Sequence, residues 1–129
     1  MNQEDLELAK KVRLNAHSPY SNFQVGAVLR CKNGKIFTGC NVENNGIQSI
    51  CAERTAFVKA ISEGERDFES ITIVGEKEGK ESAEECLPCG YCRQFMSEFV
   101  DKNFKIFTKQ NEIVREYTIE ELLPYGFKL

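Results

Sequence analysis

The sequence predicts an α/β fold: a single mixed five-stranded sheet flanked by helices, with its last two strands antiparallel. Three observations support this prediction. Five short apolar segments are typical of strands, and helical segments separate the second from the third and the third from the fourth. Only residues 109–112 separate the last two strands, too few for a parallel crossover. Because no linker, repeat or low-complexity segment interrupts the chain, we expect residues 1–129 to form one domain.

The first expected element is a helix capped by Asn2. Its apolar residues recur at the three- and four-residue steps of one helix face: Leu6, Ala9, Val12 and Ala16. The segment Ser18–Ser21 contains a proline and ends the helical pattern.

A β-hairpin follows this helix. Phe23–Arg30 alternates well enough to be a strand, and Ile36–Val42 is expected to return beside it. The connection Lys32–Lys35 contains Asn33 followed by Gly34, a pair that tolerates the positive φ angles of a type I′ turn.

The middle of the chain predicts one crossover helix and one strand. Cys51–Ser62 contains alanines and apolar pairs four residues apart, and Gly64 follows it as a helix breaker. Ile71–Val74 is a β-branched run and predicts the third strand. The charged stretch Glu76–Glu85 is expected to be a solvated loop.

The last part of the chain predicts two helices and two strands. Pro88 is expected to open a helix, because proline lacks the N–H that a first helical position leaves unpaired. The apolar stripe of this helix consists of Phe95, Phe99 and Val100. Phe104–Thr108 and Ile113–Tyr117 are the expected fourth and fifth strands. Thr118–Glu121 has the pattern of a capping box for a short helix that stops before Pro124.

The two helical connections should be right-handed crossovers between parallel strands. Both crossover helices would then start at the carboxyl ends of adjacent strands. In open α/β sheets, ligands bind at that edge.

Composition excludes several classes of function. The chain has 17 basic and 20 acidic residues, a net charge of −3 and a pI near 5.3, and no basic stripe, which argues against long nucleic acid as a partner. It has no apolar run long enough to span a membrane, and its acidic start does not resemble a signal peptide. We therefore expect a cytoplasmic protein. Six cysteines among 129 residues are too few for a disulfide-stapled scaffold, so metal ligands, nucleophiles or core thiols are the alternatives.

Three of these cysteines have the spacing of metal ligands. Cys89 and Cys92 lie three residues apart and would share one face of a helical turn. Cys51 begins the other crossover helix and can complete a set of three zinc ligands, which leaves the fourth position open as in a catalytic site. Helix N-termini also favour the thiolate form that a metal requires.

A carboxylate accompanies the cysteines. Glu53 lies two residues after Cys51, so it would not share that face of the helix as a second ligand. It can instead approach the water on the metal and move protons. A non-ligand glutamate in this position is the signature of zinc deaminases, although that signature has histidine where this chain has Cys51.

On these residues the chain resembles the small cytidine deaminases whose zinc is held by three cysteines. The similarity extends over nearly the whole chain, and the two cysteine motifs together are specific. The matching segments are Pro19–Ala27, Gly39–Asn44, Cys51–Ala56, Pro88–Gln94 and Glu121–Pro124.

The resemblance implies one Zn²⁺ per chain on Cys51, Cys89 and Cys92 and hydrolysis of cytidine or 2′-deoxycytidine to the uridine product and ammonia, as in pyrimidine salvage. Hydroxide on the zinc would attack C4 of the ring, with Glu53 as proton shuttle. Three thiolates leave the site with a net charge of −1, and the guanidinium of Arg54 would withdraw charge from the sulfurs.

The resemblance also implies a substrate site and an assembly. In the family, Asn41 and Glu43 bind the ribose hydroxyls, Phe23 packs against the base, and the Ala52 N–H and Leu87 carbonyl hold the pyrimidine edge. The implied substrate-binding set is Phe23, Asn41, Val42, Glu43, Ala52, Leu87 and Phe127. These enzymes are homotetramers in which a phenylalanine in the position of Phe127 closes the active site of another chain.

Two other interpretations of the cysteines stay open. Cys86, Cys89 and Cys92 resemble a ferredoxin run, but the fourth cysteine and the proline of that run are missing, so we interpret Cys86 as a loop thiol. The second is a non-catalytic zinc-binding module, which would hold the metal without turnover.

The choice of substrate also has alternatives. Deaminases of blasticidin S share the cysteine motifs but lack, as a group, the Asn-x-Glu-Asn motif, so Asn41 and Glu43 favour a nucleoside. The nucleic-acid-editing branch generally has a helix between its last strands, which the short connection here does not allow. The segment Asn45–Ile50 is one residue shorter than usual in the family and lacks its tyrosine, with Gln48 as the candidate replacement. Cytidine and deoxycytidine therefore both remain possible substrates.

Overall fold

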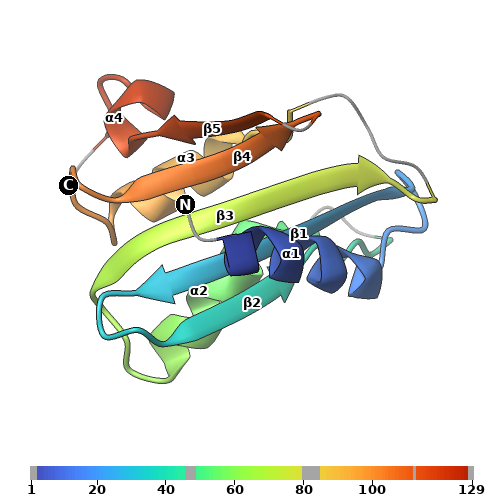
Figure 1. The fold of residues 1–129 in the computed structure, drawn as a ribbon, viewed down its shortest axis with the longest axis horizontal. Coiled ribbons are helices and arrows are strands. Elements are labelled where there is room, and N and C mark those ends of the chain that lie inside the picture. The colour runs from blue at the N-terminus through green and yellow to red at the C-terminus, as the bar shows by residue number, and fades with distance from the viewer. Residues whose placement is uncertain (1–2, 46–48, 80–84, 112, 128–129) are drawn as a thin grey trace.

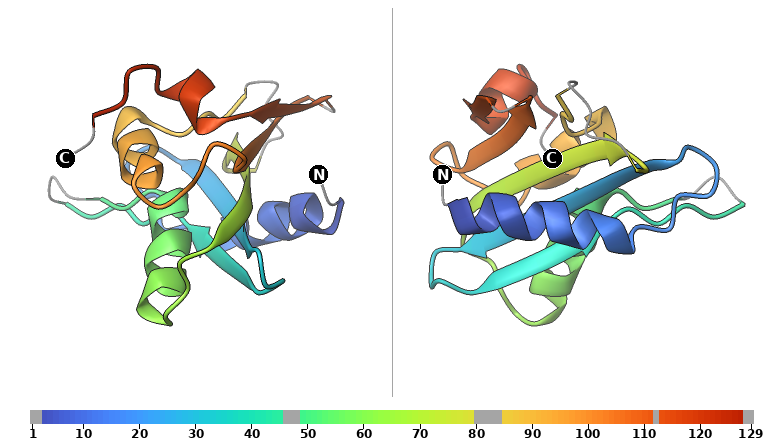
Figure 2. Two further views of the ribbon diagram at one scale, coloured as in Figure 1. Left: turned by 90° about the vertical axis from the view of Figure 1, so that its left-hand side faces the viewer. Right: turned by 45° about the vertical axis from the view of Figure 1, so that its right-hand side comes forward.

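A mixed five-stranded sheet with the order β2-β1-β3-β4-β5 forms the centre of the structure (Figure 1). The structure is a computed structural model that describes residues 3–45, 49–79, 85–111 and 113–127. Helix α1 covers one face of the sheet, and α2 and α3 cover the other (Figure 2). The predicted α/β class, the five strands and the antiparallel last pair are confirmed.

The first hairpin pairs β1 (Phe23–Cys31) with β2 (Ile36–Cys40). The predicted type I′ turn is wrong, because it requires two central residues with positive φ and only Gly34, at +92°, has one. The Cys31 carbonyl accepts from the Gly34 N–H at 3.0 Å, and the Cys31 N–H donates to the Lys35 carbonyl at 2.9 Å. The loop therefore has three residues, with glycine at its left-handed position.

Helix α1 (Gln3–Val12) ends earlier than predicted and continues as the 3₁₀ turn η1 (Arg13–Asn15). Its buried Leu6 and Ala9 pack in a small cluster against the sheet. The predicted cap, Asn2, lies outside the described residues. No helix in the described part of the chain is both long and apolar enough to cross a bilayer.

Strand β3 (Phe68–Lys77) is much longer than the predicted Ile71–Val74. The prediction of a solvated loop over Glu76–Glu85 is wrong at Glu85, whose side chain is only 15% exposed, and at Glu76, which lies in the strand and is buried. Its carboxylate is neutralised by Arg13 at 2.9 Å and by Lys109 at 3.2 Å. Two cations provide the compensation that a buried carboxylate needs, which charge patterning along the sequence could not reveal.

The crossover helices are α2 (Ala52–Ser62) and α3 (Gly90–Ser97). Helix α3 begins two residues later than predicted, because Cys89 rather than a residue before Pro88 is its N-cap. Strands β2 and β3 are both antiparallel to β1, and β3 is parallel to β4, so the strands joined by helices run in one direction as predicted.

The prediction that both crossover helices start at adjacent strands is wrong. Strand β1 inserts between β2 and β3 and pairs antiparallel with both. Helix α2 nevertheless packs closely on β2, because a Cβ atom on Gly39 would lie only 2.4 Å from the Ala52 carbonyl oxygen. Because β2 and β3 run in the same direction, α2 and α3 still begin at the same end of the sheet.

The main core lies between the sheet and helices α2 and α3. Phe57 is its central aromatic residue, with ring centroids 5.0 Å from Phe68 and 6.1 Å from Phe104. Strands β4 (Lys105–Gln110) and β5 (Ile113–Tyr117) complete the sheet. The chain then enters α4 (Ile119–Leu122), where Thr118 and Glu121 form the predicted capping box.

Candidate metal centre and active site

Three thiols meet where α2 and α3 begin. Cys51 is the N-cap of α2, Cys89 is the N-cap of α3, and Cys92 lies in the first turn of α3. Their sulfur atoms all lie within 4.8 Å of one another, and the Sγ atoms of Cys51 and Cys89 are 3.7 Å apart. Tetrahedral ligands at the usual Zn–S distance of about 2.3 Å have sulfurs about 3.8 Å apart. The donor set therefore fits Zn²⁺ closely.

The thiol cluster is electrostatically prepared to bind a cation. Hydrogen bonds from Cys92 and from Arg54 lower the pKa of the Cys51 thiol to about 5, against an opposing effect of burial. The bond with Cys51 raises the pKa of Cys92, which retains the shared proton. The backbone N–H of Cys92 also points at the Cys89 sulfur, 3.5 Å away. At least one thiolate is thus favoured before any metal is bound.

Glu53 lies in the first turn of α2 and is only 4% exposed. Burial raises the pKa of its carboxyl group to about 7, and the negative charge of Cys51 adds to this effect. A carboxyl group that titrates near neutrality can both accept and return a proton at working pH. Glu53 therefore has the properties of a general acid–base group.

A cleft of about 190 Å³ opens beside the thiols. Cys51, Cys89 and Glu53 line it. The sequence-predicted residues Asn41, Glu43, Ala52 and Leu87 line it as well. Residues from the segment after β2, the start of α2 and the segment before α3 therefore converge on one small space.

Asn41 and Glu43 are held in place by the start of β1 and the loop before it. The Asn41 side chain accepts from the Val25 N–H at 2.8 Å and donates to the Phe23 carbonyl at 2.9 Å. The Glu43 carboxylate accepts from the backbone N–H of Tyr20 and from the N–H and hydroxyl of Ser21, at 2.6–3.2 Å. The Ser21 hydroxyl bond is the main reason that the pKa of Glu43 is lowered.

Three of the predicted substrate residues lie outside the lining of the cleft. Phe23 packs against the core and Gly75. Val42 is half-exposed, and its backbone bridges to Ile50. Phe127 is 64% exposed, and its carbonyl accepts from the Gln94 side chain at 2.8 Å. The candidate loop residue Gln48 lies outside the described residues.

Arg54 lies between the thiols and an aromatic ring. Its Nη2 atom is 3.9 Å from the Cys51 sulfur and donates to the Ser49 carbonyl at 3.1 Å. The guanidinium carbon lies 4.2 Å from the centroid of the exposed Tyr91 ring. Stacking on the ring holds the cation beside the sulfur.

Sequence reasoning gave no site role to several residues that the structure connects to the cleft. Val25, Ser49, Ile50 and Cys86 line it, and Ser21 contributes through Glu43. Ser21 orients Glu43, and its only signal was its place in the matching segment Pro19–Ala27. Cys86 was interpreted as a loop thiol, but it lines the cleft and packs against Gly75. Burial raises the pKa of the Cys86 thiol to about 12, so it stays neutral there.

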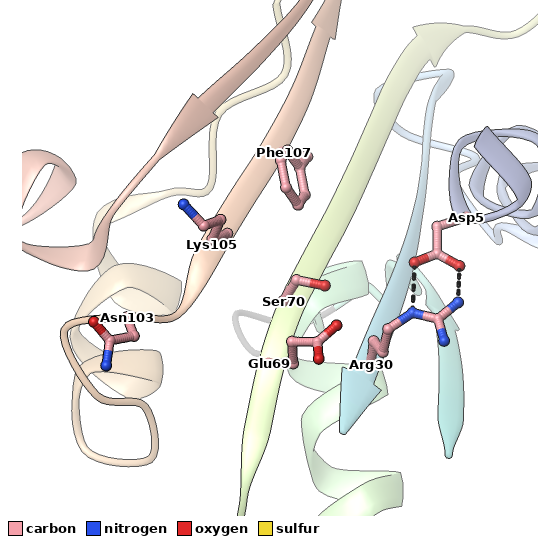
Figure 3. Close-up of a pocket in the computed structure, with 7 residues that line it drawn as sticks. All are labelled: Asp5, Arg30, Glu69, Ser70, Asn103, Lys105 and Phe107. Atoms are coloured by element: carbon pink, nitrogen blue, oxygen red, sulfur yellow. Dashed lines mark hydrogen bonds and ion pairs between the residues drawn. The ribbon is translucent and has the colours of Figure 1, made fainter. Parts of the chain in front are cut away.

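A second cavity, of about 290 Å³, lies beside α1 at the other end of the sheet, where β1 ends and β3 and β4 begin (Figure 3). Asp5 and Arg30 in its wall form a two-bond ion pair, with N–O distances of 2.7 and 3.1 Å. Its lining shares no residue with the cleft beside the cysteines. The thiols and the acid–base group therefore mark the smaller cleft as the functional site.

Fold and site together define a class: an α/β domain with a three-thiolate zinc site and a buried acid–base carboxyl group beside it. A family model described as the cytidine and deoxycytidylate deaminase zinc-binding region matches residues 1–108. The chain belongs to this family.

Individual relatives agree with this assignment. The chain is 42% identical over 121 residues to the cytidine deaminase of Sporosarcina psychrophila, covering 92% of this chain and 85% of that protein. A crystal structure of cytidine deaminase from Burkholderia pseudomallei superposes with a TM-score of 0.88 at 40% identity, covering 98% of this chain and 99% of that one. The blasticidin-S deaminase of Bacillus cereus is 32% identical over 133 residues, 98% of this chain and 94% of that protein. The family, the fold and the zinc-binding character predicted from the sequence are confirmed.

Proposed function

We propose that this protein hydrolyses cytidine and 2′-deoxycytidine to uridine and 2′-deoxyuridine with release of ammonia, as a step of pyrimidine salvage. The observation that carries the proposal is the cleft itself. Three thiols at the spacing of zinc ligands lie beside it, and the buried carboxyl group of Glu53 lines it. Asn41 and Glu43, whose side chains are suited to binding sugar hydroxyls, line it too.

Cys51, Cys89 and Cys92 would hold one zinc ion per chain. When bound, zinc supplies a Lewis acid that makes water a usable nucleophile near neutral pH. The sulfur positions and the lowered pKa of Cys51 support this role for the cysteines.

Glu53 is the proton carrier of the proposed reaction. Its carboxylate accepts the proton of the attacking water and delivers it to N3 of the pyrimidine ring, which makes C4 more electrophilic. It then moves the proton of the new C4 hydroxyl to the amino group, so that the C4–N bond breaks, ammonia leaves and the C4 carbonyl of uridine forms. A pKa of about 7 supports both directions of transfer.

The remaining residues of the cleft would bind and orient the nucleoside. The Asn41 amide would donate to a ribose hydroxyl and the Glu43 carboxylate would accept from one. Their fixed side chains support this because little side-chain freedom is lost on binding. The Ala52 N–H and the Leu87 carbonyl would hold the pyrimidine edge. Phe23 and Val42 would supply apolar surface at the margin.

Arg54 is a positioning residue in this proposal. Its guanidinium, 3.9 Å from the Cys51 sulfur, would offset part of the negative charge of three thiolates. The Tyr91 ring keeps it in that place.

We further propose that the active unit is a cytoplasmic homotetramer with shared sites. A cleft of about 190 Å³ is smaller than the roughly 300–1,000 Å³ typical of ligand pockets, so a nucleoside would need further cover. Phe127 is exposed and does not line the cleft of its own chain. This supports its use as a lid on the site of a neighbouring chain.

A deaminase of blasticidin S is the second candidate, since one such enzyme is 32% identical to this chain. Asn41 and Glu43 favour a nucleoside with a ribose, because both residues line the cleft and hydrogen bonds already hold both side chains in place. A zinc-binding module without turnover is the third.

A substrate panel separates these candidates. The zinc-loaded protein is incubated with cytidine, 2′-deoxycytidine, cytosine, adenosine and blasticidin S, and ammonia is measured. We expect release from the two cytosine nucleosides. Release from blasticidin S alone would establish the second candidate, and full zinc content without any release would establish the third.

A further inference from the structure

Glu85 is a largely buried acidic residue that the proposed chemistry leaves unused. It lies four residues before Cys89, and its side chain is 15% exposed. Its carboxylate accepts from the Thr108 hydroxyl of β4 at 2.5 Å and from the Tyr117 hydroxyl of β5 at 2.8 and 3.0 Å. The nearest cation is Arg115, whose Nε atom is 3.8 Å away. Two hydroxyls from two strands thus converge on one carboxylate.

The segment that follows Glu85 forms part of the cleft but has no regular structure. Residues 85–89 are neither helix nor strand, and Cys86, Leu87 and Cys89 line the cleft. Within the described residues, no backbone–backbone hydrogen bond links residues 85–88 to the sheet. Its geometry must therefore be set by side chains.

Two attachments hold this segment, one at each end. At its far end, Arg93 donates to the Pro88 carbonyl at 2.7 Å and to the Leu122 carbonyl of α4 at 2.8 Å. At its near end, the attachment is the Glu85 carboxylate. Leu87 lies between the two, and the Cys86 side chain packs inward against Gly75.

Strand pairing alone does not account for the Glu85 contacts. Strands β4 and β5 are already joined over five residue pairs, from Ile106–Tyr117 to Gln110–Ile113. Shielding a carboxylate from water when its ion pair is as long as the 3.8 Å to Arg115 is costly unless hydrogen bonds replace that water. Burial and the Glu85 carboxylate raise the pKa of Tyr117, so this hydroxyl keeps the proton that it donates.

We infer that Glu85 is a positioning residue: bound by the Thr108 and Tyr117 hydroxyls, it fixes the segment that presents the Leu87 carbonyl and Cys89 to the cleft. The inference rests on the proposed function for the role of Leu87. It makes β5, which contributes no residue to the cleft lining, a support of substrate binding.

The test uses Tyr117→Phe, which removes one hydroxyl on β5, together with Thr108→Val and Glu85→Ala. Residues that hold binding groups in place without touching the ligand typically change affinity or activity by about 10–100-fold. We therefore expect KM for cytidine to rise about tenfold in Glu85→Ala and several-fold in Tyr117→Phe. The kcat at full zinc occupancy should change by less than about threefold, the pattern of lost ground-state binding. Glu116→Gln is the matched control. Glu116 is the residue next to Tyr117, its replacement breaks only an exposed ion pair with Lys105, and KM should stay unchanged.

A double-mutant cycle sharpens the test. If Tyr117 acts through Glu85, Glu85→Ala combined with Tyr117→Phe should bind cytidine no more weakly than Glu85→Ala alone. Additive effects would overturn the inference. So would an unchanged KM in Tyr117→Phe and Glu85→Ala, even with a lowered melting temperature, because that result would indicate a purely structural role.

Zinc competition with a chromophoric chelator separates this inference from the proposed function. We expect Glu85→Ala to lose about tenfold in zinc affinity, because Cys89 is less well placed. If the wild type does not act on cytidine, the proposed function fails, and zinc affinity alone then decides the claim about Glu85. An affinity equal to that of the wild type would in that case overturn it.

Discussion

Opposing charges act on the buried carboxyl group of Glu53. Burial is the largest effect on its pKa and raises it, the thiolate of Cys51 raises it further, and the guanidinium of Arg54 lowers it. The same guanidinium lowers the pKa of Cys51. Arg54 thus keeps both the Cys51 thiol and the Glu53 carboxyl group closer to their ionised forms than burial alone would allow.

Replacing Glu53 by glutamine should abolish most turnover and leave the metal in place. The amide has nearly the same shape but cannot carry a proton, and positioned acid–base groups contribute about 10²–10⁴-fold. We expect kcat to fall by at least that range while zinc content stays at one per chain, as measured by ammonia release and metal analysis. Deamination near the wild-type rate would contradict the role of Glu53.

Replacing Arg54 by alanine should move the acidic limb of the pH–rate profile to higher pH. Glu53 must be ionised to accept a proton, and Arg54 is one of the groups that lower its pKa. Removing the cation raises that pKa, so more of the enzyme is inactive at a given acidic pH. Arg54→Lys is the control, since it keeps the charge and should shift the limb less. A limb at the same pH in both variants would refute the argument.

At the scale of elements, the site depends on how closely α2 approaches β2. Gly39 permits that approach, and the first turn of α2 carries Glu53 and follows Cys51 directly. Much of this was predictable, because alanine spacing predicted α2 and cysteine spacing predicted the metal ligands. The end of α1, the hairpin turn and the buried Glu76 were not, since each depends on tertiary partners.

Gly39→Ala should destabilise the protein and weaken its hold on zinc. The new Cβ would lie 2.4 Å from the Ala52 carbonyl oxygen and 2.6 Å from the Ala56 nitrogen, so α2 must shift. Overpacking of this kind typically costs about 1–3 kcal/mol, to be measured by urea unfolding of the zinc-loaded protein. Gly90→Ala is the matched control, because a Cβ there meets nothing within 4 Å. Equal stability of the two variants would contradict this account of α2 packing.

At the scale of the whole molecule, β1 lies between the two strands that feed the crossover helices. Sequence patterns predicted the directions of β2 and β3. They do not show whether β1 of the hairpin lies between these two strands or at the edge of the sheet. Local sequence patterns therefore could not determine the order of the strands in the sheet. The partners of Glu43 also escaped prediction, because Tyr20 and Ser21 reach it only through the folded loop.

Shared sites predict complementation between two impaired variants. Phe127→Ala and Glu53→Ala should each be poorly active alone, since one lacks the lid and the other the proton carrier. After denaturation, mixing and refolding with zinc, a hybrid assembly can combine Glu53 of one chain with Phe127 of another. Activity should then exceed the average of the two parents. A mixture that stays at that average, despite demonstrated subunit exchange, would argue that Phe127 serves only its own chain.

Hydrolysis of cytidine at this zinc site is the central claim, and oxygen labelling tests it most directly. The zinc-loaded protein is incubated with cytidine in ¹⁸O-labelled water, and the product is analysed by mass spectrometry beside the Glu53→Gln variant. We expect uridine carrying one ¹⁸O atom at C4, one ammonia per uridine, and almost no product from the variant. Unlabelled product, no product from the wild type, or equal product from the variant would contradict it.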